Sequence, residues 1–332
     1  MRKPIFRRLL PGFSLVLAVI SVSAQTLLVV NQGDSDISVV DPVSEQVVAT
    51  IAEKTPGVHG HEIAVSTDGR TAFLPIYGSS GVGSPGINGH EMLVIDLQLR
   101  AIVGDIDFGH GVRPHFAALD PVSGLLYVTT ELDNTVTAID PRTREIVGTI
   151  PTGQEESHML ALSHDGRLGY TANVGPGSVS VLDLAARKTV AIIQVAGKVQ
   201  RVSISADDKV VFTADQTRPR LAVIDTATKS VKTWVKLPGV GYGTAPTPDG
   251  IWLLVAIPST NRVAVVDLRS MQVARSIEVA RMPQEILIRP DGKVAYVSCA
   301  GGGKVAAIDL AQWKVEKLIV AGGFADGLGW AK

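Results

Sequence analysis

Seven aspartates divide this chain at nearly equal intervals. They are Asp41, Asp96, Asp140, Asp183, Asp225, Asp267 and Asp309, separated by 55, 44, 43, 42, 42 and 42 residues. Each closes a short apolar run, such as Val-Thr-Ala-Ile before Asp140. A fixed period in this range is typical of repeat architectures. We therefore predict an all-β fold, a seven-bladed β-propeller with four-stranded blades, formed by residues 25–332 as a single domain.

A typical unit spans residues 114–150 and contains four β-rich runs separated by turn residues. The repeated aspartate starts a turn after the third run, where its side chain can accept hydrogen bonds from backbone N–H groups two or three residues later. A catalytic residue needs no copy in every blade. We therefore interpret all seven aspartates as structural.

The first unit lacks an innermost strand, because residues 27–30 already resemble a second strand. The missing run is found at the other end of the chain, where residues 326–330 follow the last outer strand. We predict that this segment becomes the inner strand of blade 1. Both termini then share one blade, which closes the ring and leaves no open sheet edge between the first and last units.

Residues 1–24 have the three-part pattern of a signal peptide. Four basic residues precede an apolar run at 13–22 that is too short to span a bilayer comfortably, and small residues precede Gln25. The pattern predicts a periplasmic or secreted protein; an uncleaved anchor and twin-arginine export through Arg7-Arg8 stay open. We expect no membrane span once the signal is removed.

Charge and cysteine content exclude some partners. The formal net charge is −1, and removal of the four basic residues with the signal makes it more negative. No basic stripe is visible, so we expect no nucleic-acid partner. Cys299 is the only cysteine and cannot form an internal disulfide. We expect a buried, inert thiol there, and a monomeric protein.

The units differ most at the first residue of the inner strand. In chain order this position holds His61, His115, His158, Gln200, Tyr242, Gln284 and, from the closing segment, Asp326. Three imidazoles and one carboxylate thus fall on four adjacent blades. A packing role would favour similar residues in all seven units, so the asymmetry predicts a ligand site at one mouth of the central channel.

The next position adds charge near the same mouth, through Glu62, Arg201 and Glu285. Because strand side chains alternate, we expect these to point to the opposite side from the first set. Arg201 is a candidate clamp for a carboxylate ligand; the alternative is an ion pair with Glu62 or Glu285. Blade 2 also carries a glycine-rich insertion at 78–90, which is either a lid over this mouth or a tolerated surface insertion.

Several motifs resemble the YVTN-type β-propeller repeat. They are Tyr127-Val-Thr-Thr130, Tyr170-Thr-Ala-Asn173, Asn134 to Asp140, and Ile224-Asp-Thr-Ala-Thr228. The resemblance covers essentially the whole mature chain. It implies a propeller fold and an exported protein, and these repeats are similar to those of lactonase-like propellers and of the haem d1 domain of nitrite reductases.

Three functions fit these residues. The first is a binding scaffold that recognises a small molecule or a protein at the channel mouth. The second is a transition-metal or haem site that uses His61, His115, His158 and Asp326, since neutral imidazole is a common metal ligand. The third is a lactonase- or lyase-like enzyme acting on small organic acids, with a histidine base among His61, His115 and His158 and Arg201 as anion clamp.

Overall fold

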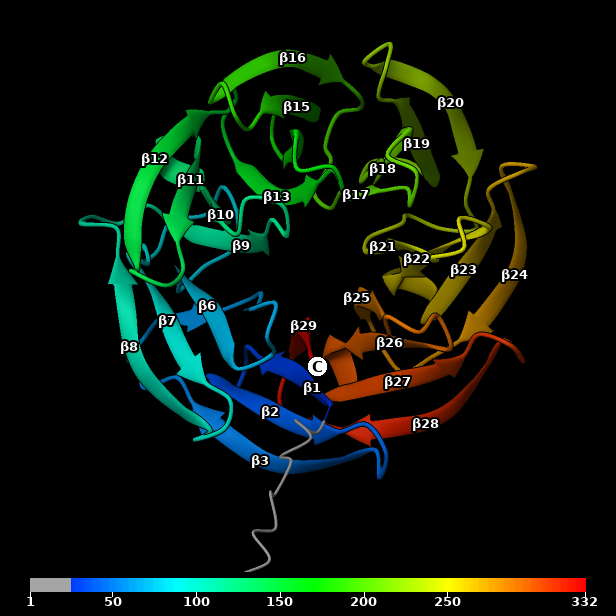
Figure 1. Ribbon diagram of the computed structural model, residues 1–332. Coiled ribbons are helices and arrows are strands. Elements are labelled where there is room, and N and C mark those ends of the chain that lie inside the picture. The colour runs from blue at the N-terminus through cyan, green and yellow to red at the C-terminus, as the bar shows by residue number, and fades with distance from the viewer. Residues whose placement is uncertain (1–24) are drawn as a thin grey trace, which may run out of the picture.

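The computed structural model describes residues 25–332, and the predicted signal peptide lies outside this range. Seven antiparallel sheets stand around a central axis, in chain order (Figure 1). The seven-bladed propeller predicted from the repeat period is confirmed.

Blade 1 is built from both ends of the chain. Its strands, from the axis outward, are β29 (Ala325–Ala331), β1 (Thr26–Asn31), β2 (Asp36–Asp41) and β3 (Gln46–Ala52). β29 pairs antiparallel with β1, with Leu27 opposite Trp330 and Val29 opposite Leu328. In Figure 1 the C-terminus lies beside β1. The predicted closure of the ring is confirmed.

The other blades use consecutive strands. Blade 2 contains β4 (His59–Gly60), β5 (Ala64–Val65), β6 (Thr71–Gly78), β7 (Glu91–Asp96) and β8 (Ala101–Asp107). Blade 3 contains β9 (Pro114–Leu119), β10 (Leu126–Thr130), β11 (Thr135–Asp140) and β12 (Glu145–Pro151). Blade 4 contains β13 (Ser157–Leu162), β14 (Leu168–Asn173), β15 (Ser178–Asp183) and β16 (Lys188–Gln194).

The last three blades repeat this plan. Blade 5 contains β17 (Ser203–Ile204), β18 (Val210–Ala214), β19 (Arg220–Asp225) and β20 (Ser230–Lys236). Blade 6 contains β21 (Thr244–Pro246), β22 (Trp252–Ile257), β23 (Arg262–Asp267) and β24 (Gln272–Glu278). Blade 7 contains β25 (Pro283–Ile288), β26 (Val294–Cys299), β27 (Lys304–Asp309) and β28 (Lys314–Val320).

Three 3-10 helices follow the second strands of blades 3, 6 and 7: η1 (Glu131–Asp133), η2 (Pro258–Thr260) and η3 (Ala300–Gly302). Within residues 25–332, no helix combines the length and apolar character needed to cross a bilayer.

All seven repeated aspartates act as expected. Asp41 Oδ1 accepts a hydrogen bond from the Val43 N–H at 2.9 Å, and Asp267 Oδ1 accepts one from the Arg269 N–H at 2.8 Å. The other five make the same kind of turn bond to the residue two or three positions on. These bonds lower the pKa of Asp41 and Asp267, since they stabilise the carboxylate.

The core consists of the faces where neighbouring blades meet. The middle strands of each blade are buried along nearly their whole length, whereas the outer strands alternate between buried and exposed residues. Tyr296 of β26, for example, packs against Leu27, Val29 and Leu328 of blade 1. A sheet packed on both faces becomes a rigid frame, and this frame positions the inner-strand residues.

The inner strands are less regular than the others. In blade 2, residues 61–63 separate β4 from β5, and in blade 5 the inner strand is reduced to β17. His61 and Arg201 therefore precede or interrupt regular strand structure. The side chains of His61 and Arg201 therefore need not follow the alternating directions of a regular strand.

Candidate functional site

Three histidines from blades 2, 3 and 4 form one buried cluster. The ring centroids of His61 and His115 lie 5.2 Å apart, and those of His115 and His158 lie 3.5 Å apart with the planes nearly parallel. The three residues are 8 %, 2 % and 3 % exposed, in that order. The structure therefore brings together the three imidazoles that the repeat alignment placed on adjacent blades.

Tyr77, at the end of β6, fills the centre of this cluster. Its ring centroid lies 4.9 Å from that of His61, 5.1 Å from that of His115 and 5.6 Å from that of His158. The Tyr77 hydroxyl donates to the carboxylate of Glu131, 2.9 Å from each oxygen. We call His61, Tyr77, His115, Glu131 and His158 the histidine cluster.

Glu131 orients one of the imidazoles. His158 Nδ1 lies 2.8 Å from Glu131 Oε2, and both side chains are almost completely buried. A carboxylate on one ring nitrogen fixes the ring and favours the proton on that nitrogen. The pair thus has the arrangement of a base held by a carboxylate.

His59 and Gln32 extend the cluster toward solvent. His59 stacks on His61 with centroids 5.3 Å apart, and Gln32 Nε2 lies 2.7 Å from His61 Nε2 and 3.1 Å from His59 Nε2. Each ring nitrogen is then the acceptor of the amide N–H. Gln32 comes from the loop after β1, so blade 1 also contributes to the site.

Burial keeps His61 and His115 neutral near pH 7. It lowers the pKa of His59, and it lowers the pKa values of His61 and His115 well below the usual range. The nearby guanidinium of Arg201 acts in the same direction at His61 and His115, because a cation disfavours a further positive charge. Neutral imidazole is the form that accepts a proton or binds a metal.

One atom of the cluster is unpartnered. His115 Nδ1 is buried and has no hydrogen-bond partner in the structure, whereas His158 Nδ1 is bound to Glu131. A buried polar group without a partner costs about 1–3 kcal/mol, so this nitrogen is a point where a ligand would be favoured.

Arg201 makes a second polar cluster with Glu62, Glu285 and Asp326. Arg201 Nη2 lies 2.7 Å from Glu62 Oε1 and 3.2 Å from Asp326 Oδ1. The Glu62 contact is an ion pair without hydrogen-bond alignment, since Glu62 Oε1 has no hydrogen-bond partner. Glu285 Oε2 accepts from the Leu328 N–H at 2.6 Å. Arg201 is therefore ion-paired within the protein, which was the alternative to its predicted role as an anion clamp.

These carboxyl groups retain protons unusually well. Burial raises the pKa of Asp326 to about 7, with the nearby Glu62 adding to the rise. Burial also raises the pKa of Glu62 well above its usual range and raises that of Glu285, although Arg201 opposes both shifts. Burial alone would lower the pKa of Arg201, but the combined interactions with Glu62, Tyr242, Asp326 and Glu285 outweigh it and the pKa is raised.

Strand alternation predicted that residues at the first inner-strand position, such as Asp326, and residues at the next position, such as Arg201, point to opposite sides. This prediction is wrong for Asp326 and Arg201. These side chains, one from each set, are hydrogen-bonded. The reason is the irregular inner edge: Arg201 lies before β17, and the pairing of β29 with β1 shifts register between Val29 and Asn31.

The remaining predicted site residues are Tyr242, which lies beside Arg201, and Gln200 and Gln284 of blades 5 and 7. The Arg201 guanidinium lies over the Tyr242 ring, 5.0 Å from its centroid. Gln284 is buried in β25 and Gln200 is partly exposed before β17. Among residues 25–332, no hydrogen bond links either glutamine side chain to the histidine cluster.

No group of three or more His, Cys, Asp or Glu residues within the described range is arranged to hold one metal ion. Cys299 is fully buried, and burial raises the pKa of its thiol to about 12. At neutral pH it is a thiol and a poor nucleophile, as the sequence predicted.

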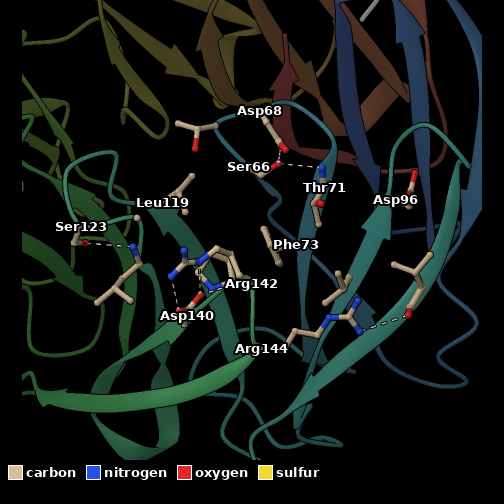
Figure 2. Close-up of a pocket in the computed structure, with 16 residues that line it drawn as sticks. Ser66, Asp68, Thr71, Phe73, Asp96, Leu119, Ser123, Asp140, Arg142 and Arg144 are labelled. Carbon is tan, nitrogen blue, oxygen red and sulfur yellow. Dashed lines mark hydrogen bonds and ion pairs between the residues drawn. The ribbon is translucent and has the colours of Figure 1, made fainter.

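A groove of about 640 Å³ between blades 2 and 3 lies away from both clusters (Figure 2). Its walls include Ser66, Asp68 and Arg142, which sit in turns at the opposite strand ends from Tyr77. Similar grooves occur between blades 5 and 6 and between blades 6 and 7. We interpret them as a recurring product of blade packing.

Tyr77, Glu131, Gln32 and Arg113 were not singled out from the sequence. The register of the second strands places Tyr77 one residue beyond the position that holds Asn31, Thr130, Asn173 and Cys299 in other units. Gln32 and Glu131 follow the second strands of blades 1 and 3 at the same repeat position as Tyr77, so extending the comparison of units to this position would have found all three.

Comparison with known proteins supports the fold assignment. The family model of the cytochrome D1 haem domain matches residues 122–309, more than half of the chain. No curated protein matches the chain significantly. Hydrazine synthase of Kuenenia stuttgartiensis is similar in structure, with a TM-score of 0.74, 20 % identity, and coverage of 86 % of this chain and 92 % of that chain.

Dihydro-haem d1 dehydrogenase NirN, solved in complex with DHE, is also similar, with a TM-score of 0.66, 14 % identity, and coverage of 91 % of this chain and 74 % of that chain. At such identities the two structural likenesses show the fold alone. The family match, together with the seven blades and the ring closure, shows that this chain belongs to the cytochrome D1 haem domain family.

Proposed function

We propose that this protein is a ligand-binding propeller whose histidine cluster binds a small molecule. The observation that carries the proposal is the unpartnered Nδ1 of His115, buried between two other imidazoles and Tyr77. Buried polar atoms in native proteins are almost always paired. A ligand that supplies the missing partner removes the cost of this atom and gains affinity from it.

The cluster favours a ligand that completes a hydrogen bond with a neutral imidazole. Burial holds the pKa of His115 well below its usual range, so its ring is neutral, with one N–H donor and one acceptor nitrogen. The Glu131–His158 pair supplies a second fixed polar group beside it. Oriented groups of this kind select a ligand by geometry.

The second candidate ligand is a haem-type tetrapyrrole, and the family match favours it. The donor chemistry fits the group, because a neutral imidazole with a free nitrogen can bind haem iron, and His115 Nδ1 is unpartnered on a ring that burial keeps neutral. When bound, such a group would supply redox and ligand-exchange chemistry at iron. His115 would hold it, Tyr77 and His158 would pack beside that ring, and Glu131 would keep His158 in one orientation.

An enzyme of the lactonase or lyase type retains one supporting feature, the Glu131–His158 pair, which is a histidine base held by a carboxylate. Its predicted anion clamp, however, is engaged by two carboxylates. We therefore place ligand binding first. We further propose an exported, monomeric protein with a YVTN-type repeat and a small-molecule partner.

The test begins with protein expressed with its leader and purified from the periplasm. Native mass spectrometry, metal analysis and an absorption spectrum report what co-purifies, and titration with hemin tests the second candidate directly. His115→Phe removes the unpartnered nitrogen at similar volume, and His164→Phe changes an exposed histidine at the far end of blade 4.

We expect the ligand or the hemin spectrum to be lost in His115→Phe and retained in His164→Phe. Equal binding by wild type and His115→Phe would overturn the proposal for this site.

A further inference from the structure

The glycine-rich insertion of blade 2 crosses three blades. We call residues 79–90, between β6 and β7, the lid loop. Both its ends lie beside Tyr77: the loop follows β6, and the Gly89 N–H donates to the Tyr77 carbonyl at 2.9 Å. Its tip reaches blade 4, because a side chain added at Gly83 would meet Glu156 Oε1 at 2.9 Å. The loop thus extends over the blades that carry His61, His115 and His158.

Arg113 joins this loop to the histidine cluster. Its guanidinium donates from Nε to Asn88 Oδ1 at 2.7 Å, and from Nη2 to the Ser84 carbonyl at 2.8 Å and Ser80 Oγ at 3.2 Å. The same guanidinium lies over the Tyr77 ring, 5.5 Å from its centroid. Loop, Arg113, Tyr77 and the imidazoles therefore form successive layers.

The lid loop is held by the Arg113 side chain and, at its C-terminal end, by backbone hydrogen bonds from the Arg113 N–H to the Gly89 carbonyl at 3.0 Å and from the Phe108 N–H to the His90 carbonyl at 2.8 Å. Most of its residues are exposed, including Ile87 at 60 %, so hydrophobic burial contributes little. Arg113 is only 5 % exposed and adopts a left-handed backbone conformation with φ of 51°. A segment held by a few polar contacts opens at a small fraction of the global unfolding free energy, so the loop can open while the propeller stays folded.

Two glycines fit the loop to a single closed path. A Cβ at Gly89 would clash with the Ile76 carbonyl oxygen, and one at Gly78, whose φ is 146°, would clash with the Ile87 carbonyl oxygen. Chain reversals this tight require glycine. The closed conformation is therefore specifically built, unlike a loose surface insertion.

We propose that the lid loop is a gate that covers the histidine cluster, and that Arg113 is the latch that keeps it closed. Opening requires the three hydrogen bonds of Arg113 to break together, which uncovers Tyr77 and the imidazoles behind it. That a ligand enters through this gate rests on the proposed function; the gate itself does not.

Chemical modification tests the gate without any ligand. Diethyl pyrocarbonate acylates accessible neutral imidazoles, and peptide mass spectrometry gives the rate at each histidine. In the wild type we expect His115 and His158 to react at least tenfold more slowly than exposed His164. In Arg113→Gln we expect at least a fivefold rise at His115 and His158, with no change at His164.

Two further variants keep the test decisive. Asn88→Ala removes one latch contact from an exposed residue, so it should fold normally and give a smaller rise. Arg142→Gln changes an exposed arginine at the far end of blade 3 and should change no rate. If Arg113→Gln does not fold, Asn88→Ala alone decides the question.

Unchanged rates at His115 and His158 in both latch variants would overturn the gate and leave the proposed function standing. Hemin binding tests the haem candidate separately. If hemin fails to bind the wild type while the modification rates still rise in the latch variants, the gate is supported and the haem candidate is rejected.

Discussion

The imidazole rings of His115 and His158 stack with their centroids 3.5 Å apart, although they belong to neighbouring blades. Their hydrogen bonding differs sharply, because His158 Nδ1 is bound to Glu131 while His115 Nδ1 has no partner. Glu131 therefore holds one ring, whereas the other keeps an unpartnered nitrogen. The two residues should respond oppositely to substitution.

His115→Phe should not destabilise the ligand-free protein. The substitution removes an unpartnered buried nitrogen, whose cost is on the order of 1 kcal/mol, and keeps a ring of similar size. We expect an equal or higher thermal midpoint. His158→Phe is the matched comparison and should lower the midpoint, because it leaves the Glu131 carboxylate without its imidazole partner. A lower midpoint for His115→Phe than for His158→Phe would contradict the difference in roles.

Glu131→Ala should destabilise the protein by about 3 kcal/mol, because it leaves both the Tyr77 hydroxyl and His158 Nδ1 without a partner. Tyr77→Phe should cost about 1 kcal/mol by losing one hydrogen bond. Since both act through Glu131, the double variant should cost less than the sum. Urea denaturation of the four proteins measures this coupling, and strict additivity would argue against a shared network.

Asp326→Asn should remove part of the pH dependence of stability. The pKa of Asp326 is raised to about 7 in the folded protein, against about 3.9 when unfolded. The folded protein holds this proton more tightly, so the contribution is full below about pH 4 and is lost as pH rises toward 7. The difference in unfolding free energy between wild type and variant should change by up to about 4 kcal/mol over this window.

The wild type must be compared with Asp326→Asn because His61 and His115 change the unfolding free energy in the opposite direction as pH rises. Their folded pKa values are lowered, so their contribution is present above about pH 6.5 and is lost as pH falls. The two clusters partly cancel in the wild type. Exposed Asp105 in β8 provides the control, and Asp105→Asn should leave the pH profile unchanged. A wild-type-like profile in Asp326→Asn would contradict the assignment.

Deletion of residues 324–332 should unfold the protein. It removes β29, and with it the inner strand of blade 1 and the buried side chains of Ala325 and Leu328. An open propeller also exposes an unpaired strand edge on β1. Circular dichroism melting should show no cooperative transition near that of the intact chain, while deletion of Lys332 alone should melt normally. A cooperative melt of the longer truncation would refute closure as the source of stability.

Much of the architecture was predictable because it repeats. The spacing of Asp41 through Asp309 gave the blade number, and the missing inner run before Leu27 gave the closure by residues 326–330. The same alignment brought His61, His115 and His158 to adjacent blades, where the structure places their rings in contact. A period in sequence translates directly into a rotation about one axis, so equivalent positions become neighbours in space.

Other relationships had no such period. Arg113 precedes β9 and binds an insertion of blade 2, so the repeat gives no signal for this contact. Strand alternation also failed for Asp326 and Arg201, because the inner edge is interrupted where these residues stand.

The sequence by itself determined the number of blades, the way the ring closes and the blades that carry the histidines, because each depends on local pattern repeated at a fixed interval. Only the tertiary structure decided that Tyr77 joins the three imidazoles, that Glu131 holds His158 and leaves His115 free, and that carboxylates engage Arg201. These contacts depend on side-chain directions at irregular inner edges, where burial in a shared low-dielectric interior selects partners from several blades at once.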